Sequence, residues 1–246
     1  MRTDVLDFLR FYETPLGCSV RDILCERIGA AWPGLKDYRS GIFGYGWPYR
    51  RALDLSERVI LLAPQEMGAL ANGRNSNAVL TADLLWPLAD ASLDRLLVVH
   101  GLEETADPRA LLREIWRVLA DDGSLIIIAA NRRSVWSMVE KTPFAAGRPW
   151  TRGQLDRFLR ASLFVPTRWS RALFMPPFNA GFVVRTANAW ERSGGVLWPS
   201  FSGVTMVEAR KEMALPIGGA KAEKLTARIL RPGVMAPSGA NSCDRP

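Results

Sequence analysis

A glycine turn and a single histidine are the two features of this sequence that could bind a ligand or take part in a reaction. Gly44 and Gly46 follow one predicted strand, and His100 follows a second strand at residues 96–99. In an open α/β sheet, glycines at a strand end let the backbone approach a bound ligand. Histidine titrates near neutral pH and can take a proton from a hydroxyl or an amine. The pattern therefore predicts a ligand site where strands end.

The spacing of the glycines excludes two common nucleotide-binding motifs. A dinucleotide fingerprint would need glycine at the position of Tyr49, and a Walker loop would need a Gly-Lys-Ser or Gly-Lys-Thr sequence. A tight turn that binds nothing is the alternative for Gly44 and Gly46. For His100, the only histidine, a structural hydrogen-bonding role is the alternative to a catalytic one. Both alternatives stay open at this level.

The elements that would position these residues are clearest between residues 93 and 131. Residues 96–99 form an unbroken apolar run, as in a strand buried on both faces. Asp107 can cap a helix that has Pro108 in its first turn, and Asp122-Gly123 is predicted to end that helix. A second buried strand follows at residues 125–130. The helix has an apolar stripe that would pack against the sheet, formed by Leu111, Leu112, Ile115, Val118 and Leu119. A strand–helix–strand crossover of this length predicts a right-handed parallel pair of strands.

The rest of the chain predicts a doubly wound α/β sheet. Further strands are expected at residues 38–45, 58–64, 78–81, 169–174 and 203–213. Helices are expected at residues 4–12, 20–32, 48–55, 65–72, 151–163 and 182–193, with Gly194-Gly195 ending the last one. Alternating polarity predicts that the final strand is antiparallel. We expect a helical cap over residues 1–37, an α/β domain over 38–215 and a basic, flexible tail over 216–246.

Short motifs around the central unit resemble those of class I S-adenosylmethionine (SAM) dependent methyltransferases of the methyltransferase domain 11 kind. The resemblance covers about residues 40–213. It implies an enzyme that uses SAM, with a seven-stranded, mostly parallel Rossmann-like sheet, N-terminal helices and an antiparallel last strand. The matching pieces are Asp83, Trp86-Pro87-Leu88, Asp90-Ala91-Ser92-Leu93-Asp94, His100, Glu114 to Leu119 and Asp122-Gly123.

The same resemblance assigns roles to individual residues. His100 would lie where the methyl acceptor meets SAM, and no metal ligands are implied. The family carries an acid two residues before the first glycine and a second acid at the end of the second strand. Ile42 and Ala63 stand at these two positions, and Pro48 replaces a third glycine. The residues implied to contact SAM are Gly44, Tyr45, Gly46, Gln65, Asp83 and Val99.

The missing acid at Ala63 has an energetic consequence. It would weaken SAM binding by roughly 1.5–3 kcal/mol, about ten- to a hundredfold, unless Gln65, Asn75 or Asn77 supplies another hydrogen bond. Turnover also requires an open crevice between the ends of the first and fourth strands. Tyr45 or Trp47 filling that crevice would contradict an enzymatic function.

Three functions follow from these observations. The first is methyl transfer from SAM to a small-molecule or protein acceptor, and the second is a methyltransferase-like binding or regulatory protein without turnover. The third, a nucleic-acid methyltransferase, is disfavoured because basic residues do not alternate with aromatic ones. Glu103 and Glu104 could face a basic acceptor but are more simply solvated loop charges. An acidic acceptor would suit a rim formed by Arg132, Arg133, Arg148 and Arg152.

Composition agrees with a single globular domain that has additions at its ends. The chain has 246 residues and a net charge of +7, and residues 217–246 hold five basic and two acidic side chains. Its three cysteines show no spacing typical of disulfide frameworks or metal sites. It has neither a signal peptide nor an apolar stretch long enough to cross a membrane, so we expect a cytoplasmic protein. The oligomeric state is left open.

Overall fold

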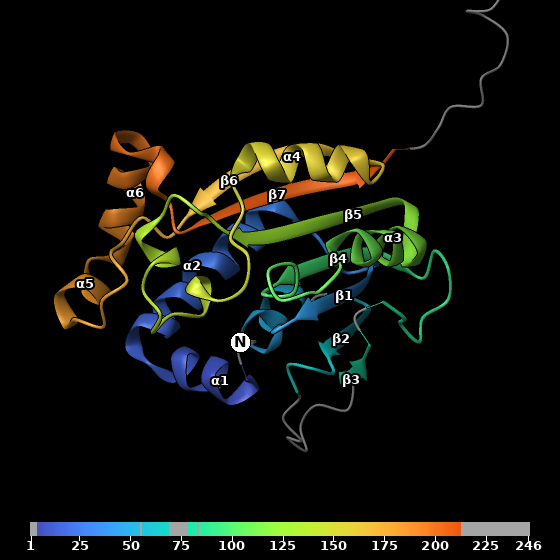
Figure 1. Ribbon diagram of the computed structural model, residues 1–246, viewed down its shortest axis with the longest axis horizontal. Coiled ribbons are helices and arrows are strands. Elements are labelled where there is room, and N and C mark those ends of the chain that lie inside the picture. Colours follow the sequence, from blue (N-terminus) through green and yellow to red (C-terminus); the bar gives the residue numbers. More distant parts are fainter. Residues whose placement is uncertain (1–3, 55, 69–77, 83, 213–246) are drawn as a thin grey trace, which may run out of the picture. The chain divides into compact units, whose positions relative to one another are not determined.

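The computed structural model describes residues 4–54, 56–68, 78–82 and 84–212, which lie in one compact unit over residues 1–212. The predicted tail at 216–246 lies outside the described residues, as do parts of the predicted helices 48–55 and 65–72. The described residues form a seven-stranded sheet in the order β3-β2-β1-β4-β5-β7-β6 (Figure 1). The strands are β1 (Arg39–Gly44), β2 (Arg58–Pro64), β3 (Ala78–Thr81), β4 (Leu93–Val99), β5 (Leu119–Ala130), β6 (Phe164–Ala172) and β7 (Val204–Lys211).

The direction of the strands confirms the predicted doubly wound sheet. β3, β2, β1, β4 and β5 pair in parallel, whereas β7 is antiparallel to both of its neighbours, β5 and β6. In the parallel register Gly44 pairs with Val99, so β1 and β4 end at the same level. The order of connection reverses between these two strands. Such a switch point is where open α/β sheets bind ligands.

Helices cover both faces of the sheet (Figure 1). One face packs against α1, α2, α5 and the 3-10 helix η1, and the other packs against α3 and α4. The α-helices are α1 (Val5–Glu13), α2 (Pro15–Ala31), α3 (Pro108–Val118), α4 (Arg152–Ala161), α5 (Gly181–Arg185) and α6 (Ala187–Leu197). The 3-10 helices are η1 (Trp47–Leu53), η2 (Val135–Ser137), η3 (Pro143–Ala145) and η4 (Pro199–Phe201).

The first two helices form a tightly joined pair. Thr14 ends α1 and also caps α2, because its side chain accepts a hydrogen bond from the Gly17 backbone N–H. Pro15 follows in the first turn, where a missing N–H costs nothing. The helix predicted to begin at residue 20 therefore begins at Pro15. A Cβ on Gly17 would lie 2.0 Å from the Phe11 carbonyl oxygen, so this close approach requires glycine.

Two predicted helix ends are wrong, for identifiable reasons. α3 ends at Val118 rather than at Asp122-Gly123, because Leu119 already pairs with Leu93 as the first residue of β5. α6 continues through Gly194-Gly195 to Leu197. A Cβ on Gly194 would lie 2.3 Å from the Phe174 Cβ, so this glycine allows close packing and does not end the helix.

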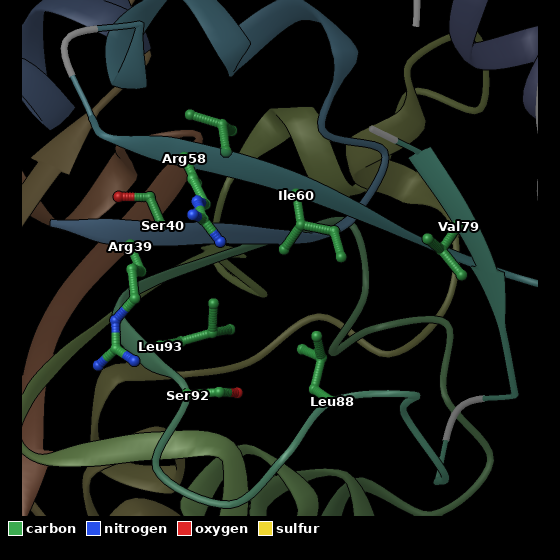
Figure 2. Close-up of a pocket in the computed structure, with 9 residues that line it drawn as sticks. Arg39, Ser40, Arg58, Ile60, Val79, Leu88, Ser92 and Leu93 are labelled. Carbon is green, nitrogen blue, oxygen red and sulfur yellow. The ribbon is translucent and has the colours of Figure 1, made fainter. Parts of the chain in front are cut away.

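The connection from β3 to β4 leaves part of one sheet face uncovered. Its described residues, 82 and 84–92, contain no helix. A hollow of about 670 Å³ results at the amino end of β1 and β2, on the face that α3 and α4 cover elsewhere. Figure 2 shows Leu88 and Ser92 of the connection around this hollow, with Ile60 of β2 and Val79 of β3. The hollow lies at the opposite sheet edge from the switch point.

Two structural features were not found in the described part of the chain. No helix there is long and apolar enough to cross a membrane. No group of three or more His, Cys, Asp and Glu side chains there could hold a metal ion.

Candidate functional site

The backbone turn after β1 lies directly against the end of β4. Gly44 has a φ of +97°, and a Cβ at this position would lie 2.0 Å from the Val99 carbonyl oxygen. The Tyr45 backbone N–H donates to that same oxygen over 3.1 Å. Only glycine can combine this backbone conformation with so close a contact. The glycine turn and Val99, both predicted from the sequence as SAM contacts, are therefore neighbours at the switch point.

An aromatic cluster, formed by Phe8, Tyr12, Tyr45, His100 and Phe144, occupies the α1 side of this turn. The Tyr45 ring is 3% exposed and stacks on Phe8, with ring centroids 4.8 Å apart. Tyr12 stacks on the same ring at 5.7 Å. Tyr45 thus fills space between the ends of β1 and β4 on this side of the sheet. The condition of an open crevice is not met there in this conformation.

His100 belongs to the same cluster and is buried. Its ring centroid lies 4.9 Å from those of Phe8 and Phe144, and its Nε2 lies 2.8 Å from the Tyr12 hydroxyl. Burial lowers the pKa of His100 to about 3, so the imidazole is neutral across the physiological range. These are the contacts expected for the structural alternative. A role for His100 as catalytic base stays a prediction.

The remaining predicted SAM contacts lie along the ends of β2 and β3. Gln65 is exposed in the turn after β2, and its backbone N–H donates to the Thr81 carbonyl over 2.8 Å. Asp83, Asn75 and Asn77 lie outside the described residues. Ala63, at the position of the missing acid, is 6% exposed.

Thr81 is a candidate ligand-binding residue that the sequence analysis missed. It is buried at the carboxyl end of β3, and its hydroxyl has no hydrogen-bond partner among the described residues. A buried hydroxyl without a partner is costly, and a bound ligand would provide one. The available signal was a hydroxyl residue at the end of a predicted strand.

Glu103 corrects the prediction of a solvated loop charge. The residue is buried between the ends of β4 and β5, where Oε1 accepts a hydrogen bond from the Ala130 N–H over 2.7 Å. Its Oε2 is buried and has no hydrogen-bond partner in the described part of the chain. Burial raises the pKa of Glu103 to about 7. A carboxyl group whose pKa burial raises to about 7 therefore lies at the same sheet edge as the glycine turn, and no pattern in the sequence indicates its burial.

The four arginines predicted to form a rim separate into two groups. Arg133 and Arg152 line one pocket together with Arg171, which the sequence analysis did not select. Arg132 instead donates to the Pro149 carbonyl over 3.2 Å, and Arg148 is exposed but is not part of that pocket lining. The structure thus brings together two of the predicted arginines and adds a third.

Comparison with protein families and relatives agrees with the predicted resemblance. The model of the methyltransferase domain family matches residues 43–127, which include the glycine turn and the central β4-α3-β5 unit except for the last three residues of β5. The uncharacterised protein Rv2003c of Mycobacterium tuberculosis is 25% identical over 207 residues, covering 78% of this chain and 69% of that protein. The uncharacterised Escherichia coli protein YafS is 44% identical over 57 residues. That shorter match spans 23% of this chain and only 24% of YafS.

Solved structures share the fold at low sequence identity. A SAM-dependent methyltransferase from Thermotoga maritima is 18% identical, with a TM-score of 0.62 over 85% of this chain and 96% of that one. A SAM-dependent methyltransferase from Archaeoglobus fulgidus is 17% identical, with a TM-score of 0.56 over 78% and 94% of the two chains. The [4+2]-cyclase SpnF is 18% identical, with a TM-score of 0.55 over 76% of this chain and 79% of that one.

The family match and the sheet topology together define the fold of this protein. Its fold is that of the class I SAM-dependent methyltransferases, and its residues 43–127 match the model of the methyltransferase domain family. The match over residues 43–127 and the shared fold agree with the resemblance to SAM-dependent methyltransferases that the central motifs predicted. SpnF has the same fold but is named for a different reaction, a [4+2] cyclisation. The fold alone therefore does not identify the methyl acceptor, which depends on the residues of the site.

Proposed function

We propose that this protein transfers a methyl group from SAM to a small-molecule or protein acceptor at the carboxyl edge of β1 and β4. The observation that carries the proposal is Gly44, whose left-handed backbone lies against Val99 at the switch point of a methyltransferase domain. Three features of the described residues fit the cofactor: the glycine turn, the exposed Gln65 amide and the unpartnered Thr81 hydroxyl. Asp83, outside the described residues, stays a proposed contact.

The proposed reaction needs little acid or base catalysis. SAM supplies an electrophilic methyl group on a sulfonium, and holding the acceptor in line with it is the main contribution the protein makes. Where the acceptor must lose a proton, Glu103 has a pKa of about 7 and an unpartnered oxygen at this edge. His100 is neutral and bonded to Tyr12, so it positions the cluster around Tyr45.

A second candidate function is a methyltransferase-like binding or regulatory protein without turnover. Two observations favour it. Ile42 and Ala63 place buried apolar side chains where the resemblance implies acids, and the aromatic cluster fills the α1 side of the glycine turn. For SAM to use that side, α1, which lies in the proposed cap over residues 1–37, would have to shift.

Calorimetric titration with SAM and with S-adenosylhomocysteine separates the two functions. The proposed enzyme binds both, and a ligand present at a hundred times its dissociation constant adds about 2.7 kcal/mol to the free energy of unfolding. The absence of any stabilisation at millimolar ligand would favour the protein without turnover. Gln65→Ala should weaken binding about three- to tenfold, because the loss of one hydrogen bond costs about 0.5–1.5 kcal/mol.

Ala63→Asp provides a gain-of-function test. The acid would stand at the end of β2, where the resemblance implies contact with the ribose. We expect ten- to a hundredfold tighter binding of S-adenosylhomocysteine, since hydrogen bonds to a charged group are worth about 1.5–3 kcal/mol. Ala189→Asp, at an exposed position in the first turn of α6, is the matched control. Equal affinities of Ala63→Asp and the unmodified protein would contradict the proposed binding mode.

The proposal also includes a cytoplasmic location. Cell fractionation with an antibody against the protein tests it directly, and recovery in the membrane fraction or outside the cell would contradict it.

A further inference from the structure

A pocket with three arginines opens at the carboxyl edge of the sheet, two strands beyond β4. Its volume is about 250 Å³. Arg133 follows β5, Arg152 is the first residue of α4, and Arg171 lies near the end of β6. The other lining side chains that carry polar groups are Asn131, Thr151, Ser200 and Thr205, and no acidic residue from the described part of the chain lines the pocket.

The strand register places this pocket on the same edge as the glycine turn. Thr205 pairs with Ala129 of β5 on one side and with Arg171 of β6 on the other. Because β7 is antiparallel, its first residues lie beside the last residues of β5. Two strand spacings of about 4.8 Å separate β4 from β7, so the pocket lies on the order of 10 Å from the end of β4.

The scaffold of the pocket is held in place by Asn131. Its side-chain amide donates to the carbonyls of Ser200 and Ser202 over 3.1 and 2.9 Å, and its Oδ1 accepts from the Arg133 N–H over 3.1 Å. The guanidinium of Arg152 lies over the Trp169 ring, 4.9 Å from its centroid. These contacts fix the backbone of Arg133 and the side chain of Arg152 before any ligand arrives.

No acidic side chain of the described residues compensates the charges of the three arginines. Among the described residues, none of Arg133, Arg152 and Arg171 forms an ion pair with a carboxylate. Other arginines of the fold do have acidic partners, such as Arg117 with Glu114 and Asp90. A planar guanidinium matches carboxylate and phosphate groups, and three of them around one small pocket favour a multiply charged anion. The amino end of the ten-residue helix α4, capped by Thr151, adds to this preference.

We propose that this pocket binds a compact anionic group, a phosphate or a carboxylate, of the methyl acceptor. This inference rests on the proposed function and names the class of acceptor: a molecule with an anionic group on the order of 10 Å from the atom that is methylated. The pocket volume suits a single such group and its water molecules, since pockets for whole drug-sized ligands begin near 300 Å³.

Titration of the full-length protein with inorganic phosphate and with citrate tests the site without any acceptor. We expect saturable binding of at least one of them by calorimetry. Arg133→Gln, Arg152→Gln and Arg171→Gln should each weaken it about tenfold or more, since a charge-assisted hydrogen bond is worth about 1.5–3 kcal/mol. Arg157→Gln, an exposed arginine of α4 that does not line the pocket, is the matched control and should bind as the unmodified protein does. The tighter of the two probes identifies the anionic group.

Three results would overturn the proposal. The first is the absence of binding by either anion at millimolar concentration, and the second is equal loss of binding in the control and the pocket variants. The third is an oligonucleotide that binds far more tightly than phosphate and depends on Arg157 as much as on Arg171, because that pattern describes an extended nucleic-acid surface. S-adenosylhomocysteine binding, measured on the same variants, reports on the proposed function separately. Phosphate binding without cofactor binding would retain the anion site and reject methyl transfer.

Discussion

The Tyr12 hydroxyl lies 2.8 Å from His100 Nε2 and 2.5 Å from the Tyr49 hydroxyl. A side chain of α1 therefore links the residue after β4 to the 3-10 helix after β1. Either direction of proton donation along this chain satisfies both hydrogen bonds. All three side chains are buried, and burial raises the pKa of both tyrosines above the ordinary value. The N-terminal helix is thus hydrogen-bonded to His100, the predicted active-site histidine, and does not merely pack against it.

Tyr12→Phe should destabilise the protein by about 1–3 kcal/mol, because it leaves both the Tyr49 hydroxyl and His100 Nε2 buried with one partner fewer. Tyr49→Phe removes one hydrogen bond and should cost less. Urea unfolding of the two variants and of the double variant measures the difference. Equal costs for both single variants would contradict a chain centred on Tyr12.

Gly44→Ala should be strongly destabilising, by about 3 kcal/mol or more, because the new Cβ would meet the Val99 carbonyl and the positive φ adds strain. Gly29→Ala is the matched control. Gly29 is exposed in α2 with open space around its Cα, so alanine should stabilise the helix by about 0.5–1 kcal/mol. Thermal unfolding should show a lower melting temperature for Gly44→Ala and a higher one for Gly29→Ala than for the unmodified protein.

Glu103 should make stability fall as pH rises from about 4.5 to about 7. In that window the unfolded chain has lost the proton of this carboxyl, whereas the folded protein still holds it because burial raises the pKa of Glu103 to about 7. The loss amounts to on the order of 3 kcal/mol, fully developed above about pH 7. Glu103→Gln should remove this slope and be the more stable protein near pH 8. Parallel pH profiles of the two proteins, from urea unfolding, would contradict the buried state.

His100 should act in the opposite direction. Burial lowers the pKa of His100 to about 3, so as pH falls below about 6.5 the unfolded chain takes up a proton that the folded protein does not. The neutral, buried His100 therefore contributes fully to the free energy of unfolding above about pH 6.5, and this contribution is lost as the pH falls toward 3. His100→Asn, chosen because asparagine tolerates the φ of +55° found here, should flatten the acid side of the profile. A turnover number retained in this variant would also reject the catalytic role predicted for His100.

The sequence predicted the elements whose signals are local. β2 and β3 have the expected bounds, and α3 begins at Pro108 with Asp107 as its cap, because capping and proline preferences act within a few residues. The start of α4, predicted at residue 151, is confirmed by Thr151 and Gln154, whose side chains each form a hydrogen bond with the other residue's backbone N–H. Class I topology also followed from the central motifs. These features needed no knowledge of which distant segments meet.

Only the tertiary structure decided which side chains are buried together. Glu103 reads as a loop charge until β5 lies beside it, and Arg171 joins Arg133 only because β6 and β7 pair next to the end of β5. Gly194 reads as a helix terminator until Phe174 packs against it. In each case the outcome depends on contact with a residue far away in the chain. Such contacts determine whether a side chain loses its water, which charges lie near it and how much volume it can occupy. Local sequence patterns report conformational preference and carry little information about those contacts.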